Sequence, residues 1–171
     1  VVGLSYMLRK TVLSGDQLSI LDKLEMSART LIGLVSDILD FSKIEAGSME
    51  LDSEVTESTK FFDTLSSISA GLPLSSDVDL IFELDKKIPD CWVIDGLKLK
   101  QILLNLLSNA AKFTSEGQVS LACKVIDLNT THAHLRFEVS DTGIGMSEEV
   151  QSRLFQPFSQ GDSSISRRFG G

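Results

Sequence analysis

The chain has 171 residues, 42% hydrophobic and 23% charged, so it has the length of one ordinary domain or of a small domain with a helical appendage, and wholesale disorder is excluded. Its 16 basic and 24 acidic residues give a net charge of −8, which argues against a nucleic-acid partner because phosphate binding needs a basic footprint. Cys91 and Cys123 have no metal-ligand spacing and no apolar run reaches a membrane span of about 18 residues, so we expect a cytoplasmic protein with reduced cysteines.

Residues 1–46 are predicted to be a helical hairpin. A short helix in VVGLSYMLRKTVL is followed by a turn at 14–16, with Asp16 as the predicted N-cap, and a long helix over about 17–46. Apolar residues of the long helix alternate steps of three and four, a heptad pattern formed by Leu21, Leu24, Ala28, Leu31, Val35 and Ile38. Further apolar residues widen this stripe, which favours a homodimer of hairpins that forms a four-helix bundle. The alternative is a hairpin docked on the second domain of its own chain.

Residues 47–171 are predicted to form a second domain, so the fold class is α+β. Gly47 ends the long helix, and an amphipathic helix over 55–70 has Phe61, Phe62 and Leu65 facing inward. Strands are predicted over 78–85 and 91–95, and a further helix over 96–113. Period-two alternation over 118–126 and 132–139 predicts an antiparallel hairpin half covered by helices, as in an α/β sandwich.

The helix over 96–113 carries an unusual polar ridge. Its predicted core side consists of Leu99, Ile102, Leu103, Leu106, Ala110 and Phe113, whereas Gln101, Asn105, Asn109 and Lys112 advance by four, four and three residues along one side. Asparagine disfavours helix interiors, so two of them four residues apart suggest a binding site. Amide oxygens suit Mg²⁺ held alongside substrate phosphates, and a lysine meets phosphate as a point charge. An ordinary solvated stripe is the alternative.

Two further segments are candidate binding loops. DTGIGM (141–146) follows a strand, and Gly143 and Gly145 permit a positive φ and close approach to a flat ligand, while Asp141 can accept a hydrogen bond from an exocyclic amine. A simple tight turn is the alternative. Residues 154–171 are long, polar and rich in Ser and Gly, which is typical of a lid or, alternatively, of a disordered terminus. His132 and His134 are assigned to the outer face of a strand, without a third metal ligand.

In this fixed order, QILLNLLSNAAKFT, DTGIGM and LFQPFSQ…RRFGG resemble the N, G1 and F boxes and the start of the G2 box of sensor histidine kinases. DILDFSKIEAG (37–47) is similar to the end of their dimerisation and phosphotransfer hairpin. The resemblance is strongest to the hybrid subclass, which is often fused to receiver domains. It implies a histidine-kinase, gyrase and chaperone type of ATP-binding domain over 47–171, a homodimer through 1–46, and a response-regulator receiver domain as partner.

The resemblance also implies roles for individual residues, with ATP and Mg²⁺ as cofactors. Asn105 and Asn109 match the residues that hold Mg²⁺ and phosphates, and Lys112 a phosphate-contacting lysine. Asp141 matches the aspartate that recognises the adenine amino group, supported by Gly143 and Gly145. The remaining residues of the implied ATP site are the lid anchors Phe155 and Phe158, then Arg168, Gly170 and Gly171, the last two beginning a glycine turn that faces the triphosphate.

Two departures from the family pattern shape the expected activity. The phosphate-accepting histidine is expected upstream of Val1, and the second glycine box stops after two glycines, so we expect residues 1–171 alone not to autophosphorylate, although the parent protein does. Two other functions stay open. A hydrolytic clamp ATPase of the same superfamily is disfavoured because such enzymes have a glutamate base where this chain has Asn105, and an amide cannot take a proton from water. The second function that stays open is a non-enzymatic dimerisation and regulatory module.

Overall fold

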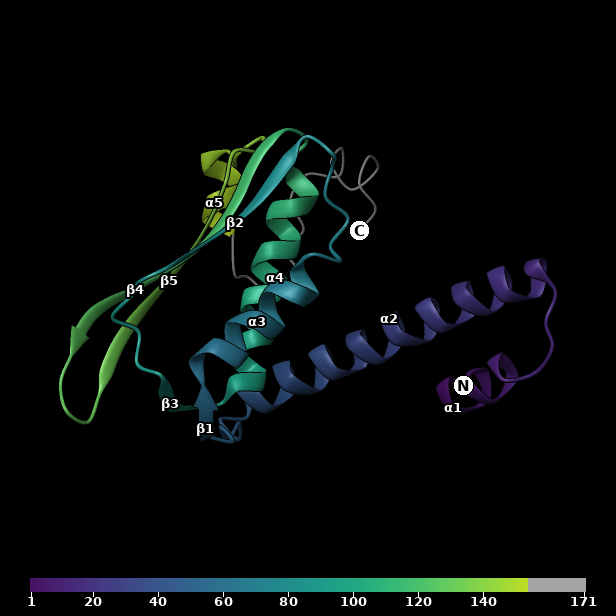
Figure 1. The fold of residues 1–171 in the computed structure, drawn as a ribbon, viewed down its shortest axis with the longest axis horizontal. Coiled ribbons are helices and arrows are strands. Elements are labelled where there is room, and N and C mark those ends of the chain that lie inside the picture. Colours follow the sequence, from purple (N-terminus) through teal and green to yellow (C-terminus); the bar gives the residue numbers. More distant parts are fainter. Residues whose placement is uncertain (154–171) are drawn as a thin grey trace. The chain divides into compact units, whose positions relative to one another are not determined.

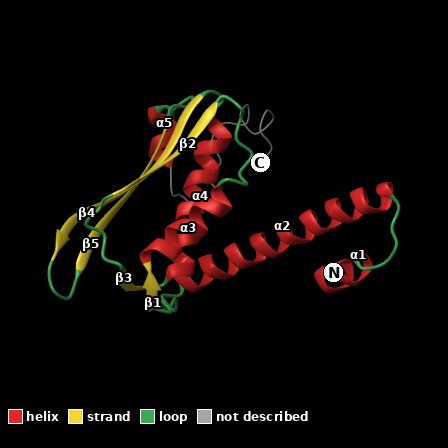
Figure 2. Cartoon of the chain, in the orientation of Figure 1, coloured by secondary structure: helices red, strands yellow, loops and turns green. Residues whose placement is uncertain are grey.

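The computed structural model describes residues 1–153 and divides the chain into two compact units, Val1–Glu50 and Leu51–Gly171 (Figure 1). The first unit contains helices α1 (Val2–Arg9) and α2 (Gly15–Glu45). The second contains all five described strands and helices α3 to α5 (Figure 2). None of the helices within residues 1–153 has the length and hydropathy needed to cross a bilayer.

Helix α2 begins at Gly15, two residues earlier than predicted, and its N-cap is Ser14. The Ser14 hydroxyl accepts a hydrogen bond from the Gln17 amide at 3.3 Å, and the Gln17 side chain accepts one from the Ser14 amide at 2.8 Å. This reciprocal capping box satisfies two amides that the first turn leaves unpaired. The prediction of Asp16 as N-cap is therefore wrong, and Asp16 lies in the first turn. At the other end Gly47 has φ of 62°, a helix-terminating conformation that glycine adopts readily.

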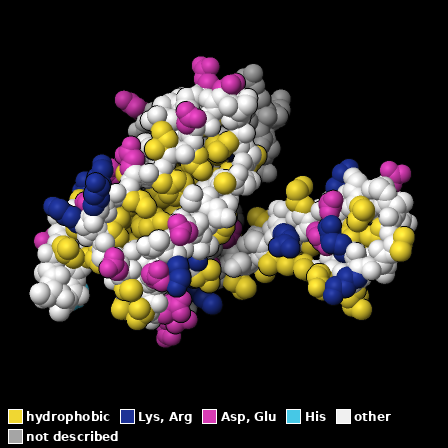
Figure 3. Space-filling model, in the orientation of Figure 1, with side chains coloured by type: hydrophobic (Ala, Val, Ile, Leu, Met, Phe, Trp, Pro, Cys, Tyr) yellow, Lys and Arg dark blue, Asp and Glu magenta, His cyan; other side chains and the backbone are white. Residues whose placement is uncertain are grey.

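Helix α1 is held against α2 by ionic contacts. Arg9 donates to Asp22 at 2.5 Å and to Glu25 at 2.9 Å. Most of the heptad positions of α2 remain exposed: Leu21 is 3% exposed, whereas Leu31 and Ile38 are 62% and 64% exposed. Exposed apolar side chains are visible along the hairpin in Figure 3. The homodimer that would cover them stays a prediction.

The second unit begins with a strand where the sequence predicted helix. Strand β1 (Glu54–Glu57) pairs antiparallel with β3 (Cys91–Ile94), and α3 runs only from Ser58 to Ser69. The prediction of helix over 55–57 is wrong because a pairing partner distant in sequence decides the backbone there. At the junction, the amide and hydroxyl of Ser58 both donate to the carbonyl of Asp90, at 2.8 and 3.1 Å.

The main sheet has the strand order β2-β4-β5. Strand β4 (Gly117–Leu128) pairs antiparallel with β5 (Ala133–Asp141), which confirms the predicted hairpin. Strand β2 (Val78–Leu84) pairs parallel with β4, and the chain passes between them through β3 and α4 (Gly96–Phe113). The described part ends in α5 (Glu148–Arg153).

Helices α3 and α4 cover one face of this sheet (Figure 1). The prediction that Phe61, Phe62 and Leu65 face inward is confirmed, since these side chains are at most 5% exposed. The two phenylalanine rings meet Trp92 with centroids 5.6 and 5.8 Å away. The other members of the buried cluster come from β2, α4 and β4: Val78, Leu103, Leu107, Ala110, Val119, Leu121 and Cys123. Both cysteines are free, as predicted, with Cys91 exposed and Cys123 buried.

Helix α4 has the predicted bounds but a different inner face. Ile102 and Leu106 were predicted to face the core, yet they are 57% and 43% exposed. Leu107 is fully buried instead, together with Leu103 and Ala110. Apolar residues surround most of this helix, so the sequence offers several faces of similar hydrophobicity, and the fit to the sheet selects one of them.

Candidate functional site

The polar ridge of α4 lies on the side of the helix that faces away from the core. Gln101, Asn105 and Asn109 are exposed, and Lys112 is half-buried. The Lys112 ammonium lies 5.5 Å from the centroid of the Phe113 ring. The structure therefore presents these side chains together along one helix, as their spacing predicted.

The ridge is fixed at its start by a helix cap. Asp95 accepts hydrogen bonds from the amide of Lys98 at 2.9 Å and, through its second oxygen, from the amide of Asp52 at 3.1 Å. The Lys98 bond is the main cause that lowers the pKa of Asp95, against a smaller opposing effect of burial. One carboxylate thus joins α4 to the first residues of the second unit.

The Asp141–Gly145 turn follows β5 and is tied to itself through Asp141. One carboxylate oxygen of Asp141 accepts a hydrogen bond from the amide of Gly143 at 2.9 Å, which is an Asx turn. Asp141 is the last residue of β5 and its side chain is exposed. This bond restricts the rotation of the carboxylate, so a ligand at the turn would meet an acceptor of defined orientation.

The two glycines of the turn have different roles. Gly145 has φ of +66° and open space around it. A side chain at Gly143 would clash with the Phe113 carbonyl and with the Asp141 carboxylate. Gly143 therefore lets the turn approach the end of α4 closely. Its close approach to a ligand stays a prediction.

The turn and the end of the ridge are held together by one main-chain contact. The amide of Ile144 donates to the Phe113 carbonyl at 3.3 Å, one of the carbonyls that a helix end leaves without an intrahelical partner. Phe113 follows Lys112 directly, so Asp141, Gly143 and the C-terminal end of the ridge form one locality. Phe113 was not predicted as part of the site, because a contact made by a backbone carbonyl does not depend on the residue type.

The other predicted site residues lie elsewhere. Phe155, Phe158, Arg168, Gly170 and Gly171 are outside the described residues. His132 precedes β5, in the β4–β5 turn, so its placement on the same strand face as His134 is wrong; its Nδ1 lies 2.8 Å from the Thr131 hydroxyl. Within residues 1–153 there is no group of three or more His, Cys, Asp or Glu side chains arranged to hold a metal ion.

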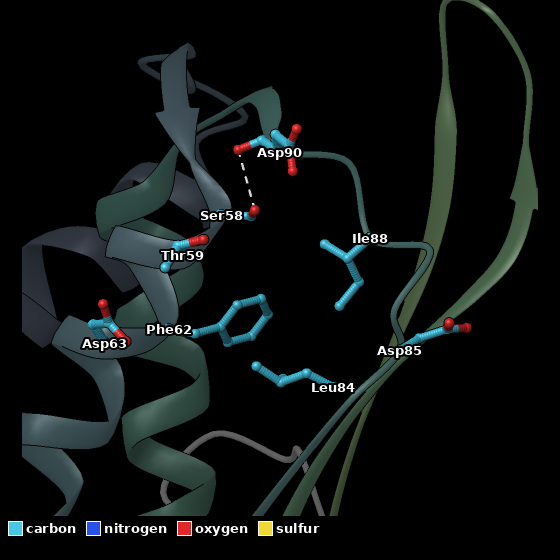
Figure 4. Close-up of a pocket in the computed structure, with 8 residues that line it drawn as sticks. All are labelled: Ser58, Thr59, Phe62, Asp63, Leu84, Asp85, Ile88 and Asp90. Atoms are coloured by element: carbon cyan, nitrogen blue, oxygen red, sulfur yellow. Dashed lines mark hydrogen bonds between the residues drawn. The ribbon is translucent and has the colours of Figure 1, made fainter.

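A separate hollow lies at the other end of β2, between α3 and the β2–β3 loop (Figure 4). It has a volume of about 220 Å³, and Phe62, Leu84 and Ile88 face its interior. Asp63 and Asp85 point away from its centre in Figure 4. None of the predicted site residues lines it, so the candidate site is the ridge and the Asp141–Gly145 turn.

Comparisons with known proteins give the family context of this site. Residues 94–171 match the family described as histidine kinase-, DNA gyrase B-, and HSP90-like ATPase. The histidine-protein kinase BarA of Escherichia coli K12 is 37% identical over 171 residues, which is all of this chain and 19% of BarA. The hybrid signal transduction histidine kinase L of Dictyostelium discoideum is 36% identical over 174 residues, again the whole chain and 10% of that protein.

Among solved structures, full-length ShkA in complex with AMPPNP superposes with a TM-score of 0.71 at 29% identity, over 97% of this chain and 35% of ShkA. The similarity therefore runs through both units. The chain spans only about a fifth or less of the length of the two kinases above. Over its whole length the chain is therefore similar to sensor histidine kinases, and its residues 94–171 match the histidine kinase-, DNA gyrase B-, and HSP90-like ATPase family.

Proposed function

We propose that the chain is the core of an ATP-dependent protein histidine kinase in a two-component phosphorelay, with the nucleotide bound between the α4 ridge and the Asp141–Gly145 turn. The observation that carries this proposal is the junction at Phe113. Its carbonyl binds the Ile144 amide, which brings a carboxylate suited to an exocyclic amine and a ridge suited to phosphates into one place.

The proposed roles follow the chemistry of each side chain. Asp141 accepts a hydrogen bond from the adenine amine, with its orientation limited by the Gly143 amide. Asn105 and Asn109 present neutral oxygen ligands, and Lys112 adds one positive charge next to them. Phe155, Phe158, Arg168, Gly170 and Gly171 are proposed to complete the site from the following segment.

The residues on α4 fit Mg²⁺ of the kind that substrate phosphates help to hold. Mg²⁺ prefers oxygen ligands and is usually bound by one or two protein groups, several waters and phosphate oxygens. Exposed amides of Asn105 and Asn109 match that chemistry, and the described residues offer no all-protein cage that would compete. When bound, the ion would offset the charge of the phosphates, while the protein contributes positioning and electrostatic stabilisation.

The phosphoryl group is proposed to go to a histidine on a dimeric helical bundle and then to a receiver aspartate. His132 and His134 do not suit the acceptor role, because they lie in the β4–β5 turn and in strand β5, and not on the helical hairpin of α1 and α2. The acceptor would therefore be supplied from outside residues 1–171. The exposed apolar stripe of α2 supports the proposed homodimer, since burying it against a second copy would remove that surface from water.

The test is nucleotide binding and phosphoryl transfer in the full-length protein. Asn109→Ala is expected to weaken Mg²⁺-ATP binding by roughly tenfold or more in calorimetry, the effect of losing a hydrogen-bonded or charge-assisted contact. Labelled ATP is expected to give an acid-labile phosphohistidine in the wild type. The dimer measured by light scattering should not change, because the substitution lies outside the hairpin.

Asn129→Ala is the matched control. It removes the same amide from the β4–β5 turn, where Asn129 caps the amides of Thr131 and His132. We expect no change in ATP affinity for this variant. Unchanged affinity in Asn109→Ala would refute the assignment of the ridge, and steady ATP hydrolysis without any phosphoprotein would replace the kinase by a clamp ATPase.

A further inference from the structure

Thr142 lies between Asp141 and Gly143 in the turn, and its hydrogen bonds reach the start of β4. Its hydroxyl accepts a hydrogen bond from the Gln118 amide at 3.0 Å. The same hydroxyl is within donating distance of the carbonyls of Glu116 and Gln118, at 3.2 and 3.4 Å. Its own amide donates to the Gln118 carbonyl at 3.1 Å.

The segment that receives Thr142 is shaped for it. Gly117 has φ of +102°, a conformation that side chains other than glycine rarely adopt. A Cβ at Gly117 would also clash directly with the Thr142 hydroxyl. We call the set Thr142, Gly117 and Gln118 the threonine clasp. It joins the end of β5 to the beginning of β4 at the edge of the described sheet.

The clasp and the Phe113 contact fix the turn from two sides. Thr142 binds the start of β4, and Ile144 binds the end of α4 through the Phe113 carbonyl. The Asp141 carboxylate lies next to the first of these anchors, and its side-chain bond goes to Gly143, between the two. An exposed aspartate after a strand would otherwise sample several rotamers, so its aim depends on the backbone that the clasp holds.

We propose that Thr142 is a positioning residue that sets base selectivity, by holding Asp141 where it accepts a hydrogen bond from the exocyclic amine of a purine. This inference rests on the proposed function, because it assigns a cause to adenine recognition at that same site. Thr142 itself is not expected to contact the nucleotide. The threonine clasp is therefore expected to affect the free energy of binding that comes from the purine amine, and to leave the contribution of the phosphates unchanged.

The experiment compares ATP with inosine triphosphate, which has a carbonyl oxygen in place of the amine and the same triphosphate. Dissociation constants for both are measured with Mg²⁺ on the full-length protein, in the wild type, Thr142→Val and Thr142→Ser. Valine keeps the shape of threonine and removes the hydroxyl, and serine restores the hydroxyl. We expect the wild type to prefer ATP by roughly tenfold, as one well-placed hydrogen bond provides.

In Thr142→Val the preference is expected to fall to about threefold or less, through weaker ATP binding at nearly constant inosine triphosphate binding, and Thr142→Ser is expected to recover it. Gly117→Ala tests the clasp from its other side, since the added methyl group displaces the hydroxyl without removing it, and it should lose selectivity in the same way. Thermal unfolding checks that each variant is folded.

The outcomes separate this inference from the proposed function. A wild type that prefers ATP and a Thr142→Val variant that keeps the preference would overturn the role of Thr142 alone. An equal loss of affinity for both nucleotides in Thr142→Val would also overturn this role, because it would show that Thr142 supports the structure of the site without affecting the choice of base. A wild type that binds neither nucleotide would overturn the proposed site and this inference with it.

Discussion

Replacing Leu107 by alanine tests the orientation of α4, on which the presentation of the ridge depends. Leu107 is 0% exposed and belongs to the main buried cluster. The change removes three carbon atoms from the core, at about 0.8 kcal/mol for each buried methylene, and leaves a cavity that adds to the cost. We expect the free energy of unfolding to fall by about 3 kcal/mol.

Leu106→Ala is the matched control, since it makes the same chemical change one position earlier on the same helix. Leu106 is already 43% exposed, so only part of its side chain leaves a protein environment and the expected loss is about 1 kcal/mol. Alanine is at least as good a helix former as leucine, so helix propensity does not explain any loss in either variant.

The assay is urea unfolding followed by tryptophan fluorescence. Trp92 is the single tryptophan of the chain and lies in the same buried cluster as Leu107, so it reports on the second unit. The slope of free energy against urea should be equal in the variants, which shows that only stability has changed. If Leu106→Ala lowered the free energy of unfolding as much as Leu107→Ala, the buried face of α4 described here would be refuted in favour of the face predicted from sequence.

Three further results are expected. Ser14→Ala should destabilise the helical hairpin by about 1 kcal/mol in a melt followed by far-ultraviolet circular dichroism, whereas Ser27→Ala, a mid-helix serine that bonds back to the preceding turn, should be neutral. Folding lowers the pKa of Asp95, so the stability that its carboxylate contributes is complete above its ordinary pKa and is lost as the pH falls through the lower value of the folded state. Below about pH 4, the urea midpoint should therefore drop less in Asp95→Asn than in the wild type. Equal drops would contradict the role of Asp95 as the helix cap. Iodoacetamide at pH 8 should modify Cys91 and spare Cys123 in the native protein by peptide mass spectrometry, because burial, with a smaller effect of Asp85, raises the pKa of the Cys123 thiol to about 11; equal labelling would contradict its burial.

The features predicted correctly from the sequence are those that depend on neighbours in the chain. The bounds of α4 agree with those predicted, 96–113. The β4–β5 hairpin follows from alternation, and Val119, Leu121 and Cys123 are all fully buried as that pattern requires. The ridge residues share one side of α4 because helix geometry fixes which positions align.

The errors arise where distant segments decide. Residues 55–57 have a helix-like pattern, but pairing with β3 makes them a strand. Ile102 and Leu106 are as hydrophobic as Leu107, and only the fit of α4 against the sheet distinguishes them. The junction at Phe113 and the clasp at Thr142 depend on main-chain atoms and on a glycine conformation, which residue types alone do not specify. The N-cap of α2 is Ser14 and not Asp16, because the preference for N-cap residue types allows either residue at this position in the sequence.

The parallel pairing of β2 with β4 has a consequence for how the second unit folds. Val78 pairs with Gly117 and Leu84 with Cys123, so the loop between the partners includes β3 and the whole of α4. Closing such a loop costs entropy before any sheet contact offsets it, and a compact helix within the loop shortens the distance to be closed. Helix α4 is therefore part of the bridge that lets the sheet nucleate. Substitutions in the ridge fall within this loop, so we expect them to change the folding rate of the second unit as well as nucleotide binding.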